Sequence, residues 1–426
     1  MSHARNRFSI LVLLLLIAFP VFSQIRIASP YSRFGIGDLS TNNNAWNSSM
    51  GGITFGMRNP SHINWINPAA LTAFDSLSFL FEGGFNIDLV TLTTSVDRSN
   101  NTYASISYLL FGMPVTRWWK TSLGLVPFSD VGYNIATYEQ LTEGGNVTRL
   151  YQGSGGMNRV YWANGFRIFK NLSIGINASY LFGSMNRDAI VIFPDSVHYA
   201  NFKVQNYITI GDIYFTYGIQ YHKKLKNDLS IVAGVVFSPE TKINAKADAI
   251  ASTFFLGASG TEYPKDTIFN AEGYKGKIVI PLFIGGGLSF GKANKWTAGV
   301  DGQWQNWKQF TAFGLTDSLI NSFQVGAGAE IIPNFENYNK YFSRINYRIG
   351  LFYSRTYLQL RNTNLNEYGI SLGFGLPLKG NKTMLQIGSQ ASFRGTTNHD
   401  LIRESSIRIF IGFSINEKWF MKRKYY

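Results

Sequence analysis

The feature of this 426-residue sequence that most constrains its fold is an alternation of apolar and polar residues, which dominates from Leu77 to the end. Successive side chains of a β-strand point to opposite faces, so a period of two indicates strands. In residues 172–182, one face carries Leu172, Ile174, Ile176, Ala178, Tyr180 and Phe182, and the other carries Ser173, Gly175, Asn177 and Ser179. The small polar faces are suited to a lumen.

The pattern predicts fourteen strands, an even number. They span residues 77–90, 102–113, 118–140, 147–169, 171–185, 200–223, 228–250, 267–290, 295–306, 320–332, 344–357, 366–377, 382–394 and 404–415. The strands of a soluble β-sandwich show the same alternation, so the lengths of the connections are needed to distinguish a sandwich from a membrane barrel.

Alternate connections between the predicted strands are mostly tight, as at residues 114–117, 170 and 224–227, and the intervening ones are mostly longer. This asymmetry is typical of outer-membrane barrels, with the short turns on the periplasmic side. The predicted fold is an all-β transmembrane antiparallel β-barrel of about 14 strands in the bacterial outer membrane. Several strands exceed the roughly 10 residues that cross the hydrocarbon, so the barrel is expected to project outward.

The composition agrees with this class. Charged residues are only 15% of the chain and aromatic residues are also 15%. Beyond Gln24 no window approaches 18 uninterrupted apolar residues, which argues against a helical membrane protein. The absence of cysteine excludes disulfides, thiolate metal sites and a lipoprotein anchor. We expect no cofactor.

Residues 1–23 are predicted to be a signal peptide. Arg5 and Arg7 precede an apolar core, and Ser23 ends a small-residue cleavage site before Gln24.

Much of the net charge of +14 belongs to the predicted tight-turn rim. The rim carries Arg117, Lys120, Lys170, Lys223, Lys224, Lys226, Lys292, Lys295, Lys379 and Lys382, and Lys418, Lys422, Arg423 and Lys424 would join them. Such a ring suits anionic phospholipid headgroups or an acidic periplasmic partner, or it simply keeps the turns in water. Nucleic-acid binding is not expected of dispersed basic turns in an exported chain.

Residues 24–76 lack the alternation, are rich in Gly and Pro, and carry Trp46, Phe55 and Trp65. About fifty residues of this composition cannot build a large core alone, so the segment is expected to pack inside something larger.

Met50-Gly51-Gly52, followed by Asn67-Pro68-Ala69-Ala70-Leu71 just before the first strand, resembles the hatch of FadL-type outer-membrane transporters of hydrophobic compounds. The resemblance implies a 14-stranded barrel whose lumen is plugged by an N-terminal hatch, with Gly51, Gly52, Asn67, Pro68, Ala69 and Ala70 in the hatch. The Gln24 start and the Trp419–Lys424 ending resemble members from Bacteroidota, which leaves the substrate open.

The predicted third strand contains Pro127, which cannot donate a ladder hydrogen bond. In the family that the chain resembles, a kink in the third strand opens a lateral gap in the wall. The resemblance assigns this lateral gate to Pro127, Phe128, Ser129, Asp130 and Gly132; an ordinary break between two shorter strands is the alternative.

Residue types used in catalysis are sparse. His62, His198, His222 and His399 are dispersed, and the one cluster of note, Asn398-His399-Asp400 near Ser405, is explained by loop polarity. No metal-binding or phosphate-binding motif appears, so the chain is predicted not to be an enzyme and to hold no metal.

The predicted organisation is signal peptide 1–23, hatch 24–76, barrel 77–416 and a basic aromatic tail 417–426. The preferred function is passive uptake of hydrophobic or amphipathic small molecules, fatty-acid-like or aromatic, by hatch movement and lateral exit. The alternative is an accessory barrel subunit of an outer-membrane secretion or insertion complex. A general porin fits the polar faces but not the plug.

Overall fold

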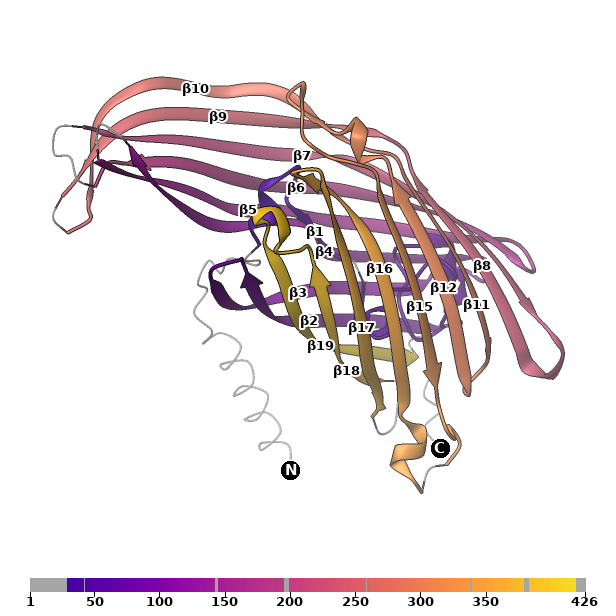
Figure 1. The fold of residues 1–426 in the computed structure, drawn as a ribbon. Helices are drawn as coiled ribbons and strands as arrows, with labels where there is room; N and C mark the ends of the chain where they lie inside the picture. Colours follow the sequence, from indigo (N-terminus) through magenta and orange to yellow (C-terminus); the bar gives the residue numbers. More distant parts are fainter. Residues whose placement is uncertain are drawn as a thin grey trace, which may run out of the picture.

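The computed structural model describes residues 29–41, 43–141, 145–194, 199–257, 259–337, 339–378 and 383–418, which form one antiparallel barrel (Figure 1). The predicted signal peptide and residues 419–426 of the predicted tail lie outside these ranges. β19 pairs with β2 from Arg403 opposite Thr93 to Lys418 opposite Ser78, and this pairing closes the barrel.

The barrel strands are β2 (Ser78–Thr93), β3 (Arg98–Pro114), β4 (Trp119–Leu141), β5 (Gly145–Phe169), β6 (Leu172–Ile192), β7 (Asn201–Lys224), β8 (Leu229–Ser238), β9 (Thr241–Leu256), β10 (Glu262–Ile280), β11 (Phe283–Lys292), β12 (Trp296–Gln305), β15 (Ser322–Ile331), β16 (Asn346–Leu360), β17 (Thr363–Pro377), β18 (Met384–Arg394) and β19 (Arg403–Lys418). The short β13 (Thr311–Ala312) and β14 (Leu315–Thr316) follow η4 (Trp307–Gln309) in the connection between β12 and β15.

The predicted number of fourteen barrel strands is confirmed once two interruptions are recognised. β8 and β9 are consecutive parts of one strand that breaks at Pro239, and β10 and β11 are parts of another that breaks at Pro281. A proline has no N–H to donate to a ladder, so each break falls where the sequence places one. β7 pairs with both β8 and β9, which shows that the two parts follow one line in the wall.

The alternation sorts side chains as the sequence predicts. In β6, Tyr180 is 51% exposed on the outer wall, whereas Ser173 and Asn177 face inward and are at most 1% exposed. The outer face therefore presents apolar side chains where a bilayer would meet it. The inward polar groups are not open to a water channel, because the N-terminal part of the chain packs against them.

Strands β4 to β7 and β10 are the longest of the barrel, and Figure 1 shows them extending, together with β9, well beyond the rest of the barrel. The predicted projection of the barrel beyond the membrane agrees with these lengths of 16 to 25 residues. The opposite rim holds mostly short connections, such as η3 (Lys226–Asp228) between β7 and β8, together with one longer connection that contains η5 (Tyr341–Arg344) between β15 and β16.

Among the described residues, no helix is long and apolar enough to span a bilayer.

Candidate functional site: the inner segment, the cavity and the break in the wall

Residues 29–41 and 43–74, called the inner segment below, run through the inside of the barrel. They contain η1 (Pro30–Arg33), β1 (Asp38–Leu39), α2 (Ala45–Ser48) and η2 (Pro68–Ala73). The Asn44 side chain accepts a hydrogen bond from the backbone N–H of Asn47 at the start of α2. Most apolar residues of this segment are buried against the barrel, and Met50 and Ile53 are fully buried.

The predicted glycine pair lies where the inner segment packs closely against the wall. Gly51 and Gly52 both have positive φ, at 68° and 79°. A Cβ at Gly51 would lie 2.6 Å from the carbonyl oxygen of Leu351 in β16, so a side chain does not fit there. The Gly51 N–H donates to Ser371 Oγ of β17 at 2.9 Å. These glycines position the segment against β15 to β17.

The predicted Asn67-Pro68-Ala69-Ala70 element starts η2. The Asn67 side chain accepts from the Ala69 N–H, and Pro68 occupies the first turn, where a missing N–H is tolerated. Asn67 Nδ2 also donates to the Phe55 carbonyl at 2.8 Å, which ties two parts of the inner segment together. A Cβ at Gly218 of β7 would lie 2.3 Å from Asn67 Oδ1, so this element is packed directly on the wall.

Charged side chains of the barrel hold the start of the inner segment. Arg394 of β18 donates to both carboxylate oxygens of Asp38 at 2.7 and 2.8 Å and to Ser29 Oγ at 2.7 Å. Its Nε donates to Glu404 of β19 at 2.6 Å. One largely buried guanidinium thus joins two barrel strands to β1 and to the residue preceding η1.

Other buried polar groups hold the middle of the inner segment. Trp46 Nε1 donates to Glu330 Oε2, which also accepts from Arg348 Nε at 2.6 Å. Asp301 of β12 accepts the backbone N–H groups of Thr54 and Phe55. The inner segment therefore has hydrogen-bond partners on three separate strands: Asp301 on β12, Glu330 on β15 and Arg394 on β18. These contacts anchor it on several sides of the barrel.

Replacing Arg394 with Met is expected to lower the free energy of unfolding by about 3–5 kcal/mol, because the buried Glu404 carboxylate and the largely buried Asp38 carboxylate would lose their partner. Urea unfolding in detergent micelles, followed by tryptophan fluorescence, measures the change. The matched control is Arg361→Met, whose pair with Asp400 is well exposed and is expected to contribute about 1 kcal/mol or less. Equal effects of the two substitutions would contradict the proposed clamp.

The wall is broken between β3 and β4. Their pairing runs from Pro114 opposite Lys120 only to Leu109 opposite Leu125. Beyond this point β4 pairs instead with β1 of the inner segment, with Leu39 opposite Ser129. The outer half of β3 keeps its pairing with β2 on one side only. The barrel therefore has a lateral interruption on the outward side of Leu109 and Leu125.

The structure brings all five predicted gate residues to this interruption. Pro127 precedes an irregularity in the pairing of β4 with β5. Phe128 turns inward and contacts Tyr214 edge-on, with ring centroids 6.1 Å apart. Ser129 Oγ donates to the Ile36 carbonyl at 2.8 Å, and Asp130 accepts from Ser40 Oγ at 3.2 Å. The Gly132 N–H donates to Ser32 Oγ at 3.0 Å. The inner segment thus covers the edge of β4 that β3 leaves.

A cavity of about 320 Å³ lies beside the interruption. Its charged wall is lined by Asp38, Asp88, Tyr103, Glu367, Arg394, Glu404 and Arg408. Its aromatic wall is lined by Phe55, Trp65, Phe128, Tyr214, Phe283, Trp304 and Phe323. Leu39 and Ser40 of the inner segment also line it, next to Tyr103 of β3. The cavity therefore offers both polar and apolar contacts and reaches the place where the wall is interrupted.

Arg159 of β5 differs from the other charged residues of the cavity. It is 5% exposed, lines the cavity, and its Nε is buried without a hydrogen-bond partner. Its guanidinium lies over the rings of Trp65 and Phe128, at 4.4 and 5.2 Å from their centroids. Among the ion pairs of the described residues, none includes Arg159. A buried cation in this state favours an anionic ligand group.

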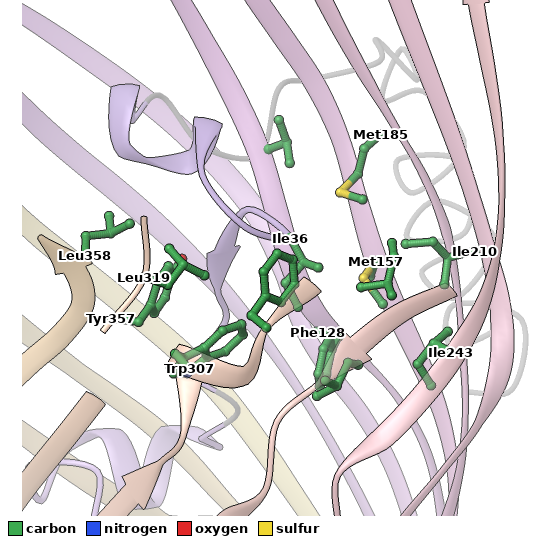
Figure 2. Packing of buried hydrophobic residues seen from close by; sticks show 14 of the residues in the cluster. Ile36, Phe128, Met157, Met185, Ile210, Ile243, Trp307, Leu319, Tyr357 and Leu358 are labelled. Carbon is green, nitrogen blue, oxygen red and sulfur yellow. The ribbon is translucent and has the colours of Figure 1, made fainter. Parts of the chain in front are cut away.

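An apolar cluster lies on the outward side of this cavity. Figure 2 shows Ile36 of the inner segment between Trp307 and Tyr357 on one side and Met157 and Ile210 on the other. The Tyr357 hydroxyl donates to the Gly37 carbonyl at 2.7 Å. Residues 29–40 therefore contribute both to this cluster and to the cover of the β4 edge.

The histidines do not form a common site in the part of the chain that the structure describes. His62 pairs with Glu82 inside the barrel at 2.9 Å, and His399 contacts Thr363 in an exposed connection at 3.0 Å. Asp400, in η6 (Asn398–Asp400), pairs with Arg361. His222 lies near the short-turn rim, and His198 is outside the described residues.

Sequence reasoning located the glycine pair, the Asn-Pro-Ala element and the kinked strand but missed Arg159, Asp38, Arg394 and Asp301. A usable signal existed for Arg159. It alternates with the outward-facing Val160 and Trp162, so it stands at an inward position in the middle of a long strand. A charge at such a position points into a barrel interior.

A closed fourteen-stranded barrel with an apolar outer wall and an inner segment defines the class of outer-membrane β-barrel proteins. Within this class, the chain belongs to the BamG family, whose model matches residues 6–426. No curated protein matches the chain significantly.

Solved structures with the same architecture confirm the fold. The toluene transporter TodX of Pseudomonas putida is 14% identical with a TM-score of 0.56, over 90% of this chain and 100% of its own. The toluene transporter TbuX of Ralstonia pickettii is 14% identical with a TM-score of 0.54, over 88% and 98%. A FadL homologue of Pseudomonas aeruginosa is 11% identical with a TM-score of 0.55, over 91% and 99%. This similarity confirms the FadL-type architecture inferred from the sequence.

Proposed function

We propose that the protein is an outer-membrane channel for passive uptake of hydrophobic or amphipathic small molecules. The observation that carries the proposal is a cavity with one charged and one aromatic wall that adjoins an interruption between β3 and β4. A molecule with an apolar body would lie against Trp65 and Phe128, and an anionic group would meet Arg159. The similarity to two toluene transporters supports an apolar cargo.

Passage requires only part of the inner segment to move. Residues 43–74 are held by Asp301, Glu330 and the close contacts around Gly51. Residues 38–41 are held to β4 by a two-residue pairing and the Ser40–Asp130 hydrogen bond, and to β18 by the Asp38–Arg394 ion pair, which their displacement would have to break. Displacement of residues 38–41 from the edge of β4 would open the cavity toward the membrane beside Tyr103. In this proposal, residues 38–41 are the part of the hatch that moves. The cargo then leaves laterally past Pro127 to Gly132.

A disulfide between Leu39→Cys and Ser129→Cys is expected to block cargo exchange. The two residues are directly opposite in an antiparallel pair, a spacing that a disulfide can bridge. The chain has no cysteine of its own, so the cross-link is unambiguous. Exchange of a fluorescent fatty acid in proteoliposomes should fall at least tenfold on oxidation and recover on reduction.

Each single cysteine variant serves as the control, since it carries the same substitution without the cross-link. Equal exchange by the oxidised and reduced double variant would contradict movement of residues 38–41. Barrel formation in all variants is checked by heat-modifiable migration in gels.

A second candidate function is an accessory barrel subunit of a larger outer-membrane complex. Two observations favour it: the dense anchoring of the inner segment, and the projecting edge strand β10, where Tyr263, Ile268, Phe269 and Tyr274 are all more than half exposed. Exposed apolar groups on an edge strand suit a protein partner. Stable co-purification with other outer-membrane proteins would favour this function over uptake.

A further inference from the structure

An apolar groove of about 640 Å³ runs along the lipid-facing wall over β8, β11, β12, β15 and β16. Two rows of register partners define its shape: Leu288, Val300, Ala327 and Leu351 form one, and Phe290, Ala298, Ala329 and Ile349 form the other. Three of the four positions on the middle strands β12 and β15 are alanines, the fourth is Val300, and larger side chains stand on the flanking strands β11 and β16. The groove therefore follows the strand direction, as an extended hydrocarbon chain would.

The groove lies at the short-turn end of the barrel. Phe290 and Ala298 are two residues from Lys292 and Trp296, the last register pair before the β11–β12 turn. Two residues of a strand span about 7 Å, so the turn lies just beneath the groove. Short turns mark the periplasmic side, which places the groove at the depth of the inner leaflet.

The foot of the groove is strongly basic. The β11–β12 turn carries Lys292 and Lys295, and neither takes part in an ion pair of the described residues. The two flanking connections add Lys223, Lys224, Lys226, Lys340 and Arg344 against Asp228 and Glu336. Lys223 is directly opposite Ile231, a residue that lines the groove. An apolar groove with a basic foot complements an anionic lipid.

We propose that this groove and the turn beneath it form a binding site for an anionic phospholipid of the periplasmic leaflet. One acyl chain lies against Ala298, Ala327 and Ala329, and the phosphate group contacts Lys292 and Lys295. Trp296 stands between the two parts, at the depth where tryptophan commonly lies in membrane proteins. The site is on the outer wall, so it is independent of cargo passage through the lumen.

Native mass spectrometry tests the site on the full chain released from nanodiscs of phosphatidylethanolamine and phosphatidylglycerol. The wild type is expected to retain phosphatidylglycerol in excess of its share of the bilayer. The variant Lys292→Gln/Lys295→Gln should lower this retention about tenfold, because both cationic contacts to the phosphate are lost. Ala298→Leu/Ala329→Leu should lower retention of both lipids, because it fills the groove and leaves the charge unchanged.

The matched control is Lys246→Gln/Lys275→Gln, which removes two exposed lysines that are register partners at the opposite, projecting end. It should retain lipid as the wild type does. Unchanged phosphatidylglycerol retention in the Lys292→Gln/Lys295→Gln variant, or an equal loss in the control, would overturn the proposal. The proposal would also be overturned if a partner protein co-purified with the wild type and was lost from the Ala298→Leu/Ala329→Leu variant, because the groove would then be occupied by protein and not by lipid.

Discussion

Replacing Arg159 with Met is expected to weaken binding of a carboxylate amphiphile such as a fatty acid by about tenfold to hundredfold. Arg159 lines the cavity without an acidic partner, so the ligand supplies the anion that its buried guanidinium lacks. A hydrogen bond to a charged group contributes about 1.5–3 kcal/mol, which corresponds to that range of affinity. Binding of a neutral alcohol of equal chain length should change much less, since it depends on Trp65 and Phe128.

Equilibrium binding to the detergent-solubilised protein measures both ligands. Arg159→Lys is the matched control, because it retains the charge and should restore part of the affinity. Loss of affinity for the acid and the alcohol to the same extent would contradict a charge-selective cavity and indicate a packing defect instead.

Deleting residues 24–76 is expected to raise the permeability to small polar solutes at least tenfold. The deletion would uncover inward polar faces such as Ser173 and Asn177, which are now buried under the inner segment. Liposome swelling in sugars of increasing size measures the change, with the full-length chain at the same protein-to-lipid ratio as control. Circular dichroism and heat-modifiable migration establish that the shortened barrel has formed. A well-formed barrel with unchanged swelling would contradict a plugging role for this segment.

The strand number and the sidedness of the barrel could be predicted from the sequence because each strand repeats one physical constraint. Alternate residues of each strand face lipid, so the alternation within residues 172–182 is enough to predict a strand and its lipid-facing side. The interruption near Pro127 was predictable for a similar reason, since proline removes a ladder hydrogen bond wherever it stands.

The contacts that create the cavity depend on residues far apart in the chain. Arg394 meets Asp38 across 356 positions, and Asp301 meets Phe55 across 246. No local pattern selects these pairs, because an acid on an inward face looks the same with or without a partner inside the barrel. The path of residues 29–40 to the edge of β4 could not be predicted from the sequence either, because only two of these residues form a strand and two residues show no alternation.

The central claim is that the lumen carries an amphipathic small molecule, and its most direct test is gentle extraction from native membranes. Native-gel separation followed by mass spectrometry then identifies both lipophilic ligands and co-migrating proteins. The uptake function predicts a monomer that carries a reproducible amphipathic molecule, which the Arg159→Met variant no longer retains. A ligand-free barrel locked to a larger protein complex would contradict it and assign the chain to the accessory role.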